Sequence, residues 1–187
     1  MKHLGGYMEE GDPHTFLPDI WGYISLKYQI RSVLDVGCGT GHALKWFRDY
    51  RKARAIGVEG SQDALDKSVV PLEILKKHDY TQGPLALKGQ YDLGISLEFL
   101  EHVEEKYINN FMVTFTKCKY LLVSHATPGQ DGHHHVNCQH KQYWIEIFKR
   151  YRMMELPDES EMFMQTNNLI KSPWCRDNLL FFKNEDY

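Results

Sequence analysis

A short apolar run that leads into three closely spaced glycines constrains the fold of this chain more than any other feature. Residues 33–41 read VLDVGCGTG, and residues 42–50 continue with the spacing of a helix that buries Leu44 and Phe47. In an open α/β sheet, such a turn lies at the carboxyl end of a strand, where ligands bind. Glycines let the backbone approach a ligand closely, and the free N–H groups at a helix start attract an anion. The turn therefore predicts a ligand site, here for a carboxylate.

Short β-rich runs alternate with helical patterns along most of the chain, which is typical of βαβ units and a parallel sheet. Six runs have the pattern of strands, at residues 32–36, 55–59, 91–97, 120–124, 152–156 and 178–182. A shorter seventh run covers residues 72–75. Helices are expected from residue 42, after the N-cap candidate Ser61, from residue 108 and near residues 140–151. We expect one doubly wound α/β sheet.

The composition excludes several classes of protein. The chain has 187 residues, a formal net charge of −3, 42% hydrophobic and 25% charged residues, which is ordinary for a globular domain. No apolar run approaches the roughly 18 residues that span a bilayer, and residues 1–10 contain no apolar segment, so we expect no secretory signal there. The four cysteines form no C-x-x-C pair, which indicates free thiols in a reducing compartment. We expect a cytoplasmic protein without a membrane segment or a strongly basic surface.

We expect a single domain overall, in which residues 31–187 form the sheet domain and residues 1–30 form a cap ahead of the first strand. The cap contains apolar residues at the spacing of a short amphipathic helix, namely Trp21, Ile24 and Tyr28. Residues 5–18 combine Gly and Pro, which break regular structure, with apolar side chains. This combination predicts a lid over the ligand site, so that removal of residues 1–17 would lower activity and leave the fold intact.

Two acidic residues stand where an adenosine ligand would need them. Glu59 ends the second strand, 18 residues past Gly41, where a carboxylate accepts hydrogen bonds from both ribose hydroxyls. Asp79 follows the short third strand, where a carboxylate receives an adenine amino group. Dinucleotide dehydrogenases share the acidic second-strand residue, but their turn is G-x-G-x-x-G, whereas here the third glycine comes one residue early. That class stays as an alternative.

With these motifs, the sequence resembles the class I S-adenosylmethionine-dependent methyltransferases. Residues 33–41 resemble their glycine-rich motif, and residues 55–60 resemble their acidic motif. Residues 91–103, YDLGISLEFLEHV, resemble their fourth-strand motif, and the order and spacing of all three motifs match over roughly residues 30–150. The resemblance implies a Rossmann-like, seven-stranded, mostly parallel sheet with an antiparallel last strand. It also implies S-adenosyl-L-methionine as the cofactor and S-adenosyl-L-homocysteine as the product.

The same resemblance implies which residues contact the cofactor. The methionine part would face the turn and the strand before it, at Asp35, Gly37 and Gly39. The ribose would be held by Glu59, and the adenine by Asp79 and Tyr80. The methyl side would be lined by Ser96, Leu97 and Glu98. Neighbouring positions complete the expected cofactor set: Cys38, Gly41 and Gly60.

Methyl transfer mainly requires that a nucleophile is aligned with the methyl carbon, and a hydroxyl or ammonium acceptor also benefits from a base. The candidate catalytic residues lie after the fourth and fifth strands: Glu98, His102, His134 and His135. Histidine suits this role because its reference pKa is about 6.5. Residues 128–137, PGQDGHHHVN, follow the fifth strand and are called the histidine loop below. Substrate contacts are expected from three more residues: His125, His133 and Asn137.

The histidine loop carries a further resemblance. Small, poorly characterised methyltransferases of microbial and viral origin contain a similar segment, in which His-Val-Asn precedes a Tyr-Trp-Ile helix. This resemblance favours His135 and Asn137 but assigns no substrate. An ordinary surface loop, whose histidines bond to the backbone, is the alternative interpretation.

The pattern Glu98-x-x-Glu101-His102, together with a later histidine, raises the question of a metal. Two carboxylates and two imidazoles are ligands for a divalent ion, and the pattern looks like the metal-binding pattern of the small-RNA 3′-terminal 2′-O-methyltransferases. However, the same residues are widespread in metal-free small-molecule methyltransferases. A net charge of −3 also does not indicate the basic surface expected of the RNA family. We therefore assign no metal and keep the metal site as an alternative.

The expected function is transfer of a methyl group to an oxygen or nitrogen atom of a small-molecule or sugar-like acceptor, by a monomer or homodimer. About thirty residues precede the first strand, so we expect no large recognition domain for a nucleic acid. The densest basic run, in residues 45–54, is typical of a solvated helix face. Methylation of RNA or a nucleotide, and a cofactor-binding module without chemistry, are the alternatives.

Overall fold

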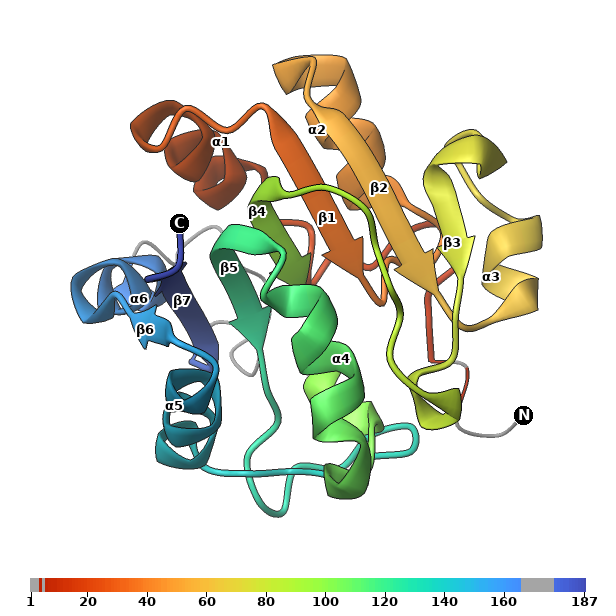
Figure 1. Cartoon of the computed structure of the whole chain (residues 1–187). Helices are drawn as coiled ribbons and strands as arrows, with labels where there is room; N and C mark the ends of the chain where they lie inside the picture. Colours follow the sequence, from red (N-terminus) through yellow and green to blue (C-terminus); the bar gives the residue numbers. More distant parts are fainter. Residues whose placement is uncertain (1–3, 5, 166–176) are drawn as a thin grey trace.

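A seven-stranded sheet organises the part of the chain that the computed structural model describes, which is residue 4, residues 6–165 and residues 177–187 (Figure 1). The order across the sheet is β3-β2-β1-β4-β5-β7-β6. The strands are β1 (Ser32–Val36), β2 (Arg54–Glu59), β3 (Leu75–Lys77), β4 (Tyr91–Ser96), β5 (Cys118–Ser124), β6 (Met153–Glu155) and β7 (Leu179–Asn184). β7 is antiparallel to β5 and β6, and the other neighbouring pairs are parallel. The predicted Rossmann-like fold is therefore confirmed.

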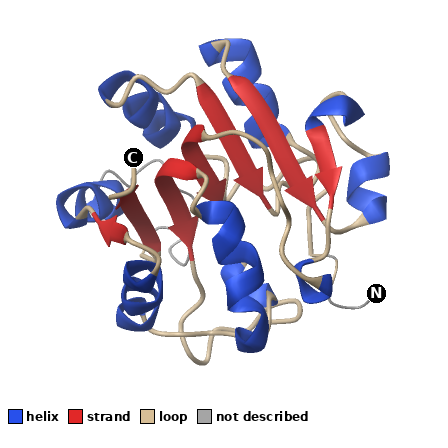
Figure 2. Ribbon diagram, in the orientation of Figure 1, coloured by secondary structure: helices blue, strands red, loops and turns tan. Residues whose placement is uncertain are grey.

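Helices cover both faces of the sheet (Figure 2). The α-helices are α1 (Pro18–Lys27), α2 (His42–Arg51), α3 (Gln62–Asp66), α4 (Ile108–Phe115), α5 (Lys141–Arg150) and α6 (Pro157–Gln165). Short 3-10 turns connect them: η1 (Leu72–Ile74), η2 (Tyr80–Gln82), η3 (Leu100–His102) and η4 (Glu105–Tyr107). The predicted helical spacing of the sequence accounts for α1, α2, α4 and α5.

Two large apolar clusters lie on opposite faces of the sheet. On one face, α4 and α5 pack aromatic side chains together, and the rings of Phe115 and Phe148 stack at 6.0 Å. On the other face, α1, α2 and α6 contribute Trp21, Phe47 and Phe163. These large buried side chains supply much of the driving force for folding, because each removes a wide apolar surface from water.

The third strand differs from its prediction. Residues 72–74 form the 3-10 turn η1 after Pro71, and the strand covers only Leu75–Lys77, where Gly57 pairs with Leu75. The proline starts a turn, so pairing begins only when the chain has come alongside β2. Between the last two predicted strands, for which no element was predicted, the structure contains the helix α6, and residues 166–176 lie outside the described residues. The other strand and helix boundaries agree with the predictions to within a few residues.

The topology places a ligand crevice at one edge of the sheet. The chain passes from β1 outward to β2 and β3, and then returns to β4 on the other side of β1. In sheets of this kind, ligands bind outside the carboxyl ends of the strands where the order reverses, which here is the edge at β1 and β4.

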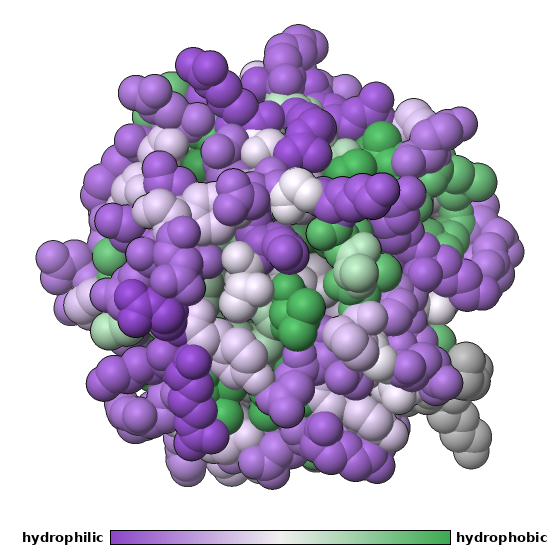
Figure 3. All heavy atoms as spheres, in the orientation of Figure 1, coloured by the Kyte–Doolittle hydropathy of each residue, from purple (hydrophilic) through white to green (hydrophobic). Residues whose placement is uncertain are grey.

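The outer surface is mainly polar. On the face that Figure 3 shows, hydrophilic side chains predominate, and apolar side chains form small separate patches. No helix in the described part of the chain has the length and apolar character needed to cross a membrane.

Candidate functional site

A cavity of about 570 Å³ lies at the carboxyl ends of β1, β2 and β4. Its wall combines the glycine-rich turn after β1 with the ends of β2 and β4. Residues of the cap and of the histidine loop complete the wall, although they are far apart in the sequence. Most of the candidate residues therefore line one space.

The glycine-rich turn leaves open space at one position only. Gly37 and Gly39 have φ angles of +76° and +53°, which residues with a side chain rarely adopt. A Cβ on Gly37 would lie 2.9 Å from Cδ2 of Phe99, so this glycine is needed for packing. A Cβ on Gly39 would meet only the Cβ of Tyr7, at 3.5 Å. Gly39 therefore borders the cavity, whereas Gly41 lies outside its wall and is the N-cap of α2.

Glu59 is held rigidly at the end of β2. One carboxylate oxygen accepts a hydrogen bond from the backbone N–H of Gly39 at 2.9 Å, and the other accepts from the N–H of Ser61 at 2.7 Å. Burial raises the pKa of Glu59. Its carboxylate is thus oriented in the cavity wall before any ligand arrives.

Asp35 is a buried carboxyl in the wall, with 5% of its surface exposed. Burial, and to a smaller extent the negative charge of Glu59, raise its pKa to about 7. A carboxyl with this pKa changes its charge near neutral pH, and a positively charged ligand group beside it would favour the ionised form.

The side of the cavity near β3 is aromatic. The Asp79 carboxylate accepts hydrogen bonds from the N–H and hydroxyl of Thr81, at 2.9 and 2.8 Å, and so begins the turn η2. Tyr80 donates its hydroxyl to Thr114 at 3.0 Å, and its ring contacts Phe99 edge-on. Phe99 and His78 also line this side, and the sequence analysis did not single them out.

Glu98 follows β4 in a left-handed backbone conformation, with a φ of +52°. Its backbone N–H donates to the hydroxyl oxygen of Ser124 at 2.7 Å, and that hydroxyl donates to the Glu98 carboxylate at 3.3 Å. Ser124, another residue that the sequence analysis missed, therefore links the ends of β4 and β5 and holds Glu98. Burial raises the pKa of Glu98, and the negative charge of Asp12 raises it further.

Two backbone hydrogen bonds fix the histidine loop to η3. The carbonyl oxygen of Glu101 accepts from the N–H groups of Val136 and Asn137, at 2.9 and 3.1 Å. The Asn137 side chain is buried and donates to the carbonyl of Val103 at 3.1 Å. These contacts bring His135 next to His102, with 5.0 Å between the ring centres.

His135 has a defined tautomer. Its Nδ1 lies 3.0 Å from the carbonyl oxygen of Gln130. Because a carbonyl oxygen only accepts hydrogen bonds, Nδ1 carries the proton, and in the neutral ring the lone pair is on Nε2. His102 is neutral at pH 7, because burial lowers its pKa to about 4. Both imidazoles line the cavity.

Glu101 is buried beside these two histidines and has no exposed surface. Neither of its carboxylate oxygens has a hydrogen-bond partner, and the same is true of Nδ1 of His102. One ligand atom each from Glu101, His102 and His135 lie within 4.8 Å of one another. Burial and the charge of Glu98 raise the pKa of Glu101, since a buried carboxylate without a partner is costly.

Some of the expected site residues lie behind the cavity wall. His125 and Ser96 are buried, and the Ser96 hydroxyl donates to the carbonyl of Val36 at 2.9 Å, which ties β4 to β1. His134 is half-buried with a φ of +51°, and it is not among the lining residues. Asn137 is also absent from the wall, whereas His133 lines it.

The cap contributes two polar side chains that the sequence analysis overlooked. Asp12 and His14 line the cavity, as does Trp21, whereas only the apolar residues of this region had suggested a contact. A polar pair spaced Asp-x-His within a stretch that is otherwise turn-like was the available signal.

The cap is anchored to α3 and to the glycine-rich turn. Lys67, just after α3, lies 3.1 Å from the Glu9 carboxylate and 3.2 Å from the Asp63 carboxylate. Tyr7 donates its hydroxyl to Asp63, and Thr40 donates its hydroxyl to the carbonyl of Glu9. Gly5 lies outside the described residues, so the lid predicted for residues 5–18 is described from Gly6 onward.

Comparison with known families gives one match that covers most of the chain. The model of a family described as "Methyltransferase domain" matches residues 14–164. Among curated protein sequences, none matches this chain.

Several solved methyltransferase structures have the same fold at low sequence identity. The methyltransferase domain of bacterial CtHen1-C is 18% identical, with a TM-score of 0.61 over 89% of this chain and 96% of that chain. PKMT2 from Rickettsia typhi, solved with AdoHcy, is 12% identical, with a TM-score of 0.63 over 94% and 54% of the two chains. The plantazolicin methyltransferase BpumL, solved with SAH, is 16% identical, with a TM-score of 0.58 over 90% and 82%.

Proposed function

Because this chain belongs to the methyltransferase domain family and is an S-adenosylmethionine-dependent methyltransferase, we propose that it methylates an oxygen or nitrogen atom of a small-molecule or sugar-like acceptor. One continuous cavity carries this proposal: Glu59 and the glycine-rich turn form one part of its wall, and Glu98 and His135 another. Its volume of about 570 Å³ is typical of a site for small ligands. An acceptor held beside Glu98 and His135 would lie next to the cofactor, as methyl transfer requires.

The residues of the glycine-rich turn and its neighbours fit the cofactor. Gly39 leaves space for a ligand, and the Glu59 carboxylate is already oriented to accept ribose hydroxyls. When bound, the cofactor supplies an electrophilic methyl group whose leaving group is a neutral thioether. The proposed contacts are the expected cofactor residues that line the cavity: Asp35, Gly37, Cys38, Gly39, Glu59, Gly60, Asp79, Tyr80 and Leu97.

Cofactor affinity is expected to rise with pH. If the Asp35 carboxylate holds the ammonium group of the methionine part, binding needs its ionised form, and its pKa is about 7. Calorimetric titrations should then show affinity about tenfold tighter at about pH 8 than at about pH 6. Folding stability depends on pH in the opposite direction. Because the pKa of Asp35 is raised, the folded chain binds this proton more tightly than the unfolded chain does. The contribution of protonated Asp35 to the free energy of unfolding is therefore fully present below about pH 4 and is lost as pH rises through about 7. Asp35→Asn should bind more weakly, without this rise.

His135 is the base that the geometry favours. The residue lines the cavity, and the lone pair of its neutral ring is on Nε2, which would accept the proton of an acceptor hydroxyl as the methyl group moves, or the proton of an ammonium group before the transfer. Glu98 stands beside it, held by Ser124, and would orient the acceptor through a hydrogen bond. The cap and the histidine loop would exclude water from the reacting atoms.

We also propose that residues 6–18 act as the lid of a cap comprising residues 1–30. Lys67 holds this segment through Glu9, while Gly6 lies against His133 of the histidine loop. Leu17 is 3% exposed and belongs to the core, so a truncation meant to spare the fold should end before Phe16.

Loosening the lid is expected to lower methyl transfer. Removal of residues 1–15 should reduce turnover about tenfold or more, and Lys67→Met several-fold, because the site loses its cover. Lys88→Met is the matched control, since Lys88 is exposed and outside the cavity wall. Circular dichroism would verify the fold of each variant. Full turnover by the truncated chain would show that the segment is dispensable.

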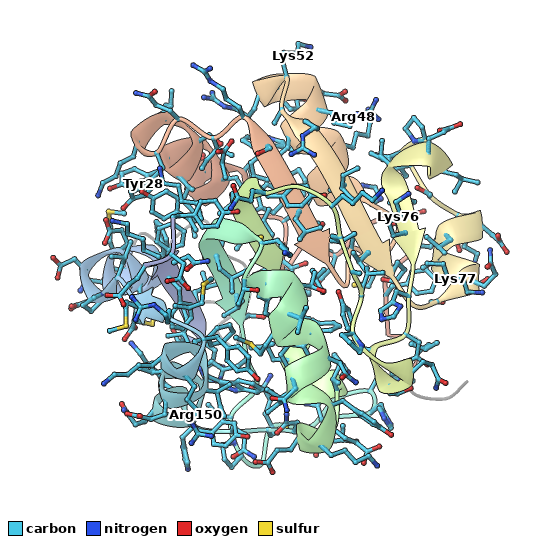
Figure 4. The ribbon with its side chains drawn as sticks, viewed as in Figure 1. Tyr28, Arg48, Lys52, Lys76, Lys77 and Arg150 are labelled. Atoms are coloured by element: carbon cyan, nitrogen blue, oxygen red, sulfur yellow. The ribbon has the colours of Figure 1, made fainter. Side chains whose placement is uncertain are left out.

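The basic run of residues 45–54 gives little support for a nucleic-acid acceptor. Figure 4 shows Arg48 and Lys52 at the far end of α2, away from the carboxyl ends of β1 and β2. In the basic run, Lys45 pairs with Asp49, and Arg54 donates to a backbone carbonyl and packs over the ring of Tyr91. Phosphate binding needs cations beside the site.

A labelling experiment tests the proposed acceptor class. Purified protein with methyl-labelled cofactor would be incubated separately with a metabolite extract, with total RNA and with cell protein. Label is expected in a low-molecular-mass product of the extract. Label that enters only RNA or protein would contradict the proposal.

The cluster of Glu101, His102 and His135 favours a second candidate, which is metal-assisted 2′-O methylation of RNA or a nucleotide. The cluster fits a divalent ion, because the Glu101 oxygens and His102 Nδ1 are buried without a partner. Glu101, His102 and His135 would hold the ion, with Glu98 near them, and the ion would act as a Lewis acid toward ribose hydroxyls.

Metal binding can be measured without an acceptor. Titration of Mn²⁺ or Mg²⁺ into the chelator-treated protein should show one site that Glu101→Gln removes, if this candidate is correct. Metal-dependent label in RNA would then establish it. Absence of binding in the wild-type protein would leave the metal-free function.

A further inference from the structure

Among the described residues, the cavity wall contains no lysine or arginine, and beside six histidines it carries six carboxylates. These carboxylates come from the cap, the ends of four strands and the histidine loop: Asp12, Asp35, Glu59, Asp79, Glu98 and Asp131. On the proposed function, Asp35, Glu59 and Asp79 contact the cofactor. The remaining three therefore surround the space left for the acceptor.

Asp12 is the cap residue in this group. The chain turns at this point, and the Asp12 carboxylate accepts a hydrogen bond from the backbone N–H of His14 at 2.8 Å. Asp12 is half-buried in the cavity wall. Its charge acts on Glu98, because it raises the pKa of that carboxyl, whereas His135 and His14 lower it. The lid thus brings a carboxylate within electrostatic reach of Glu98.

Asp131 lies at the rim of the same space. It is exposed and adjoins Gly132, which packs directly against the His135 ring. An acceptor that approaches His135 would therefore pass between a carboxylate of the histidine loop and a carboxylate of the lid.

We propose that these carboxylates select the acceptor by charge, with Asp12 as the specificity residue: the site takes a neutral or cationic hydroxyl or amine compound and rejects one that carries phosphate or carboxylate. This inference rests on the proposed function and names its substrate class more narrowly. An anionic acceptor would lose hydration on entry and would then be repelled by the negative charges of the cavity wall. A hydroxyl or ammonium group would instead donate hydrogen bonds to the same oxygens.

To test the charge selection, candidate acceptors are separated by charge before they are incubated with the enzyme. A metabolite extract would be passed over an anion exchanger at neutral pH, which gives a bound, anionic fraction and an unbound fraction of neutral and cationic compounds. Each fraction would be incubated with the full chain and methyl-labelled cofactor. Label is expected in the unbound fraction. Label in the bound fraction alone would overturn the charge selection and leave the proposed small-molecule function intact.

Substitution of Asp12 tests the assigned residue. Asp12→Lys should lower turnover of the unbound-fraction acceptor about tenfold or more and permit labelling in the bound fraction, because a cation replaces the anion. Asp12→Glu should keep the wild-type selectivity. Asp66→Lys is the control for the same change of charge, since Asp66 is exposed on α3 and outside the wall.

The outcomes distinguish a failure of the role assigned to Asp12 from a failure of the proposed small-molecule function. Unchanged selectivity in Asp12→Lys, in a variant that still folds and binds cofactor, would remove Asp12 from the specificity role. Label that appears only in RNA or protein, or in no fraction although the cofactor binds, would contradict the proposed function and this inference with it.

Discussion

Gly39→Arg is expected to abolish cofactor binding and leave the fold intact. A Cβ at this position would meet only Tyr7 of the cap, so the core does not oppose a side chain there. The rest of the arginine would extend into the cavity where the ligand must approach the backbone. The φ of +53° adds local strain in the turn. Calorimetry with S-adenosylmethionine should show a loss of affinity of about a hundredfold or more, which corresponds to roughly 3 kcal/mol.

Gly89→Arg is the matched control for this change. Gly89 also has a positive φ, of +87°, and a Cβ there would meet nothing within 4 Å. It therefore reproduces the strain and the added charge without entering the cavity.

Glu59→Ala tests the same cofactor site, because it removes the carboxylate that would accept hydrogen bonds from the ribose. The loss of these charge-assisted hydrogen bonds should weaken cofactor binding about tenfold to a hundredfold. Wild-type affinity in both Gly39→Arg and Glu59→Ala would show that the cofactor lies elsewhere.

The predictions that succeeded depend on short, local patterns. An apolar run followed by G-x-G-x-G determines a strand, a turn and a helix within a few residues, and Glu59 then follows from the next strand, which pairs directly with β1. The antiparallel last strand was predicted from the family resemblance, and the antiparallel pairing of β5 with β7 confirms this prediction. Pattern and topology together therefore identified the edge of the sheet at which the cavity lies.

The features that the sequence analysis missed depend on contacts between distant segments. Asp12 lines the same cavity as Glu98 because Lys67 and Thr40 anchor the cap beside the glycine-rich turn, and no local pattern of the sequence predicts those contacts. The relative positions of Glu101 and His135 depend on two backbone hydrogen bonds between η3 and the histidine loop. Similarly, no spacing rule indicated that Asn137 would face Val103.

His135→Ala is expected to lower kcat by about a hundredfold to ten-thousandfold, which is the usual contribution of a general base. Cofactor affinity should stay unchanged, because the ring lies beside His102 and acts on Glu98, in the part of the wall that is proposed for the acceptor. The acceptor would be the labelled fraction of the extract, and calorimetry would measure the cofactor separately. Added imidazole should restore part of the lost rate, as a small base can occupy the vacated space.

Gly132→Ala tests whether the position of the His135 ring matters. A Cβ on Gly132 would lie 2.1 Å from Nε2 of His135, so the ring must move away from its present place. This variant should lose much of the activity although the imidazole is retained, since small displacements of a catalytic group are costly. His140→Ala is the control, because His140 is exposed before α5 and outside the cavity wall. If His134→Ala instead caused the larger loss of kcat, the base would be His134, and the loop would have to rearrange when the acceptor binds.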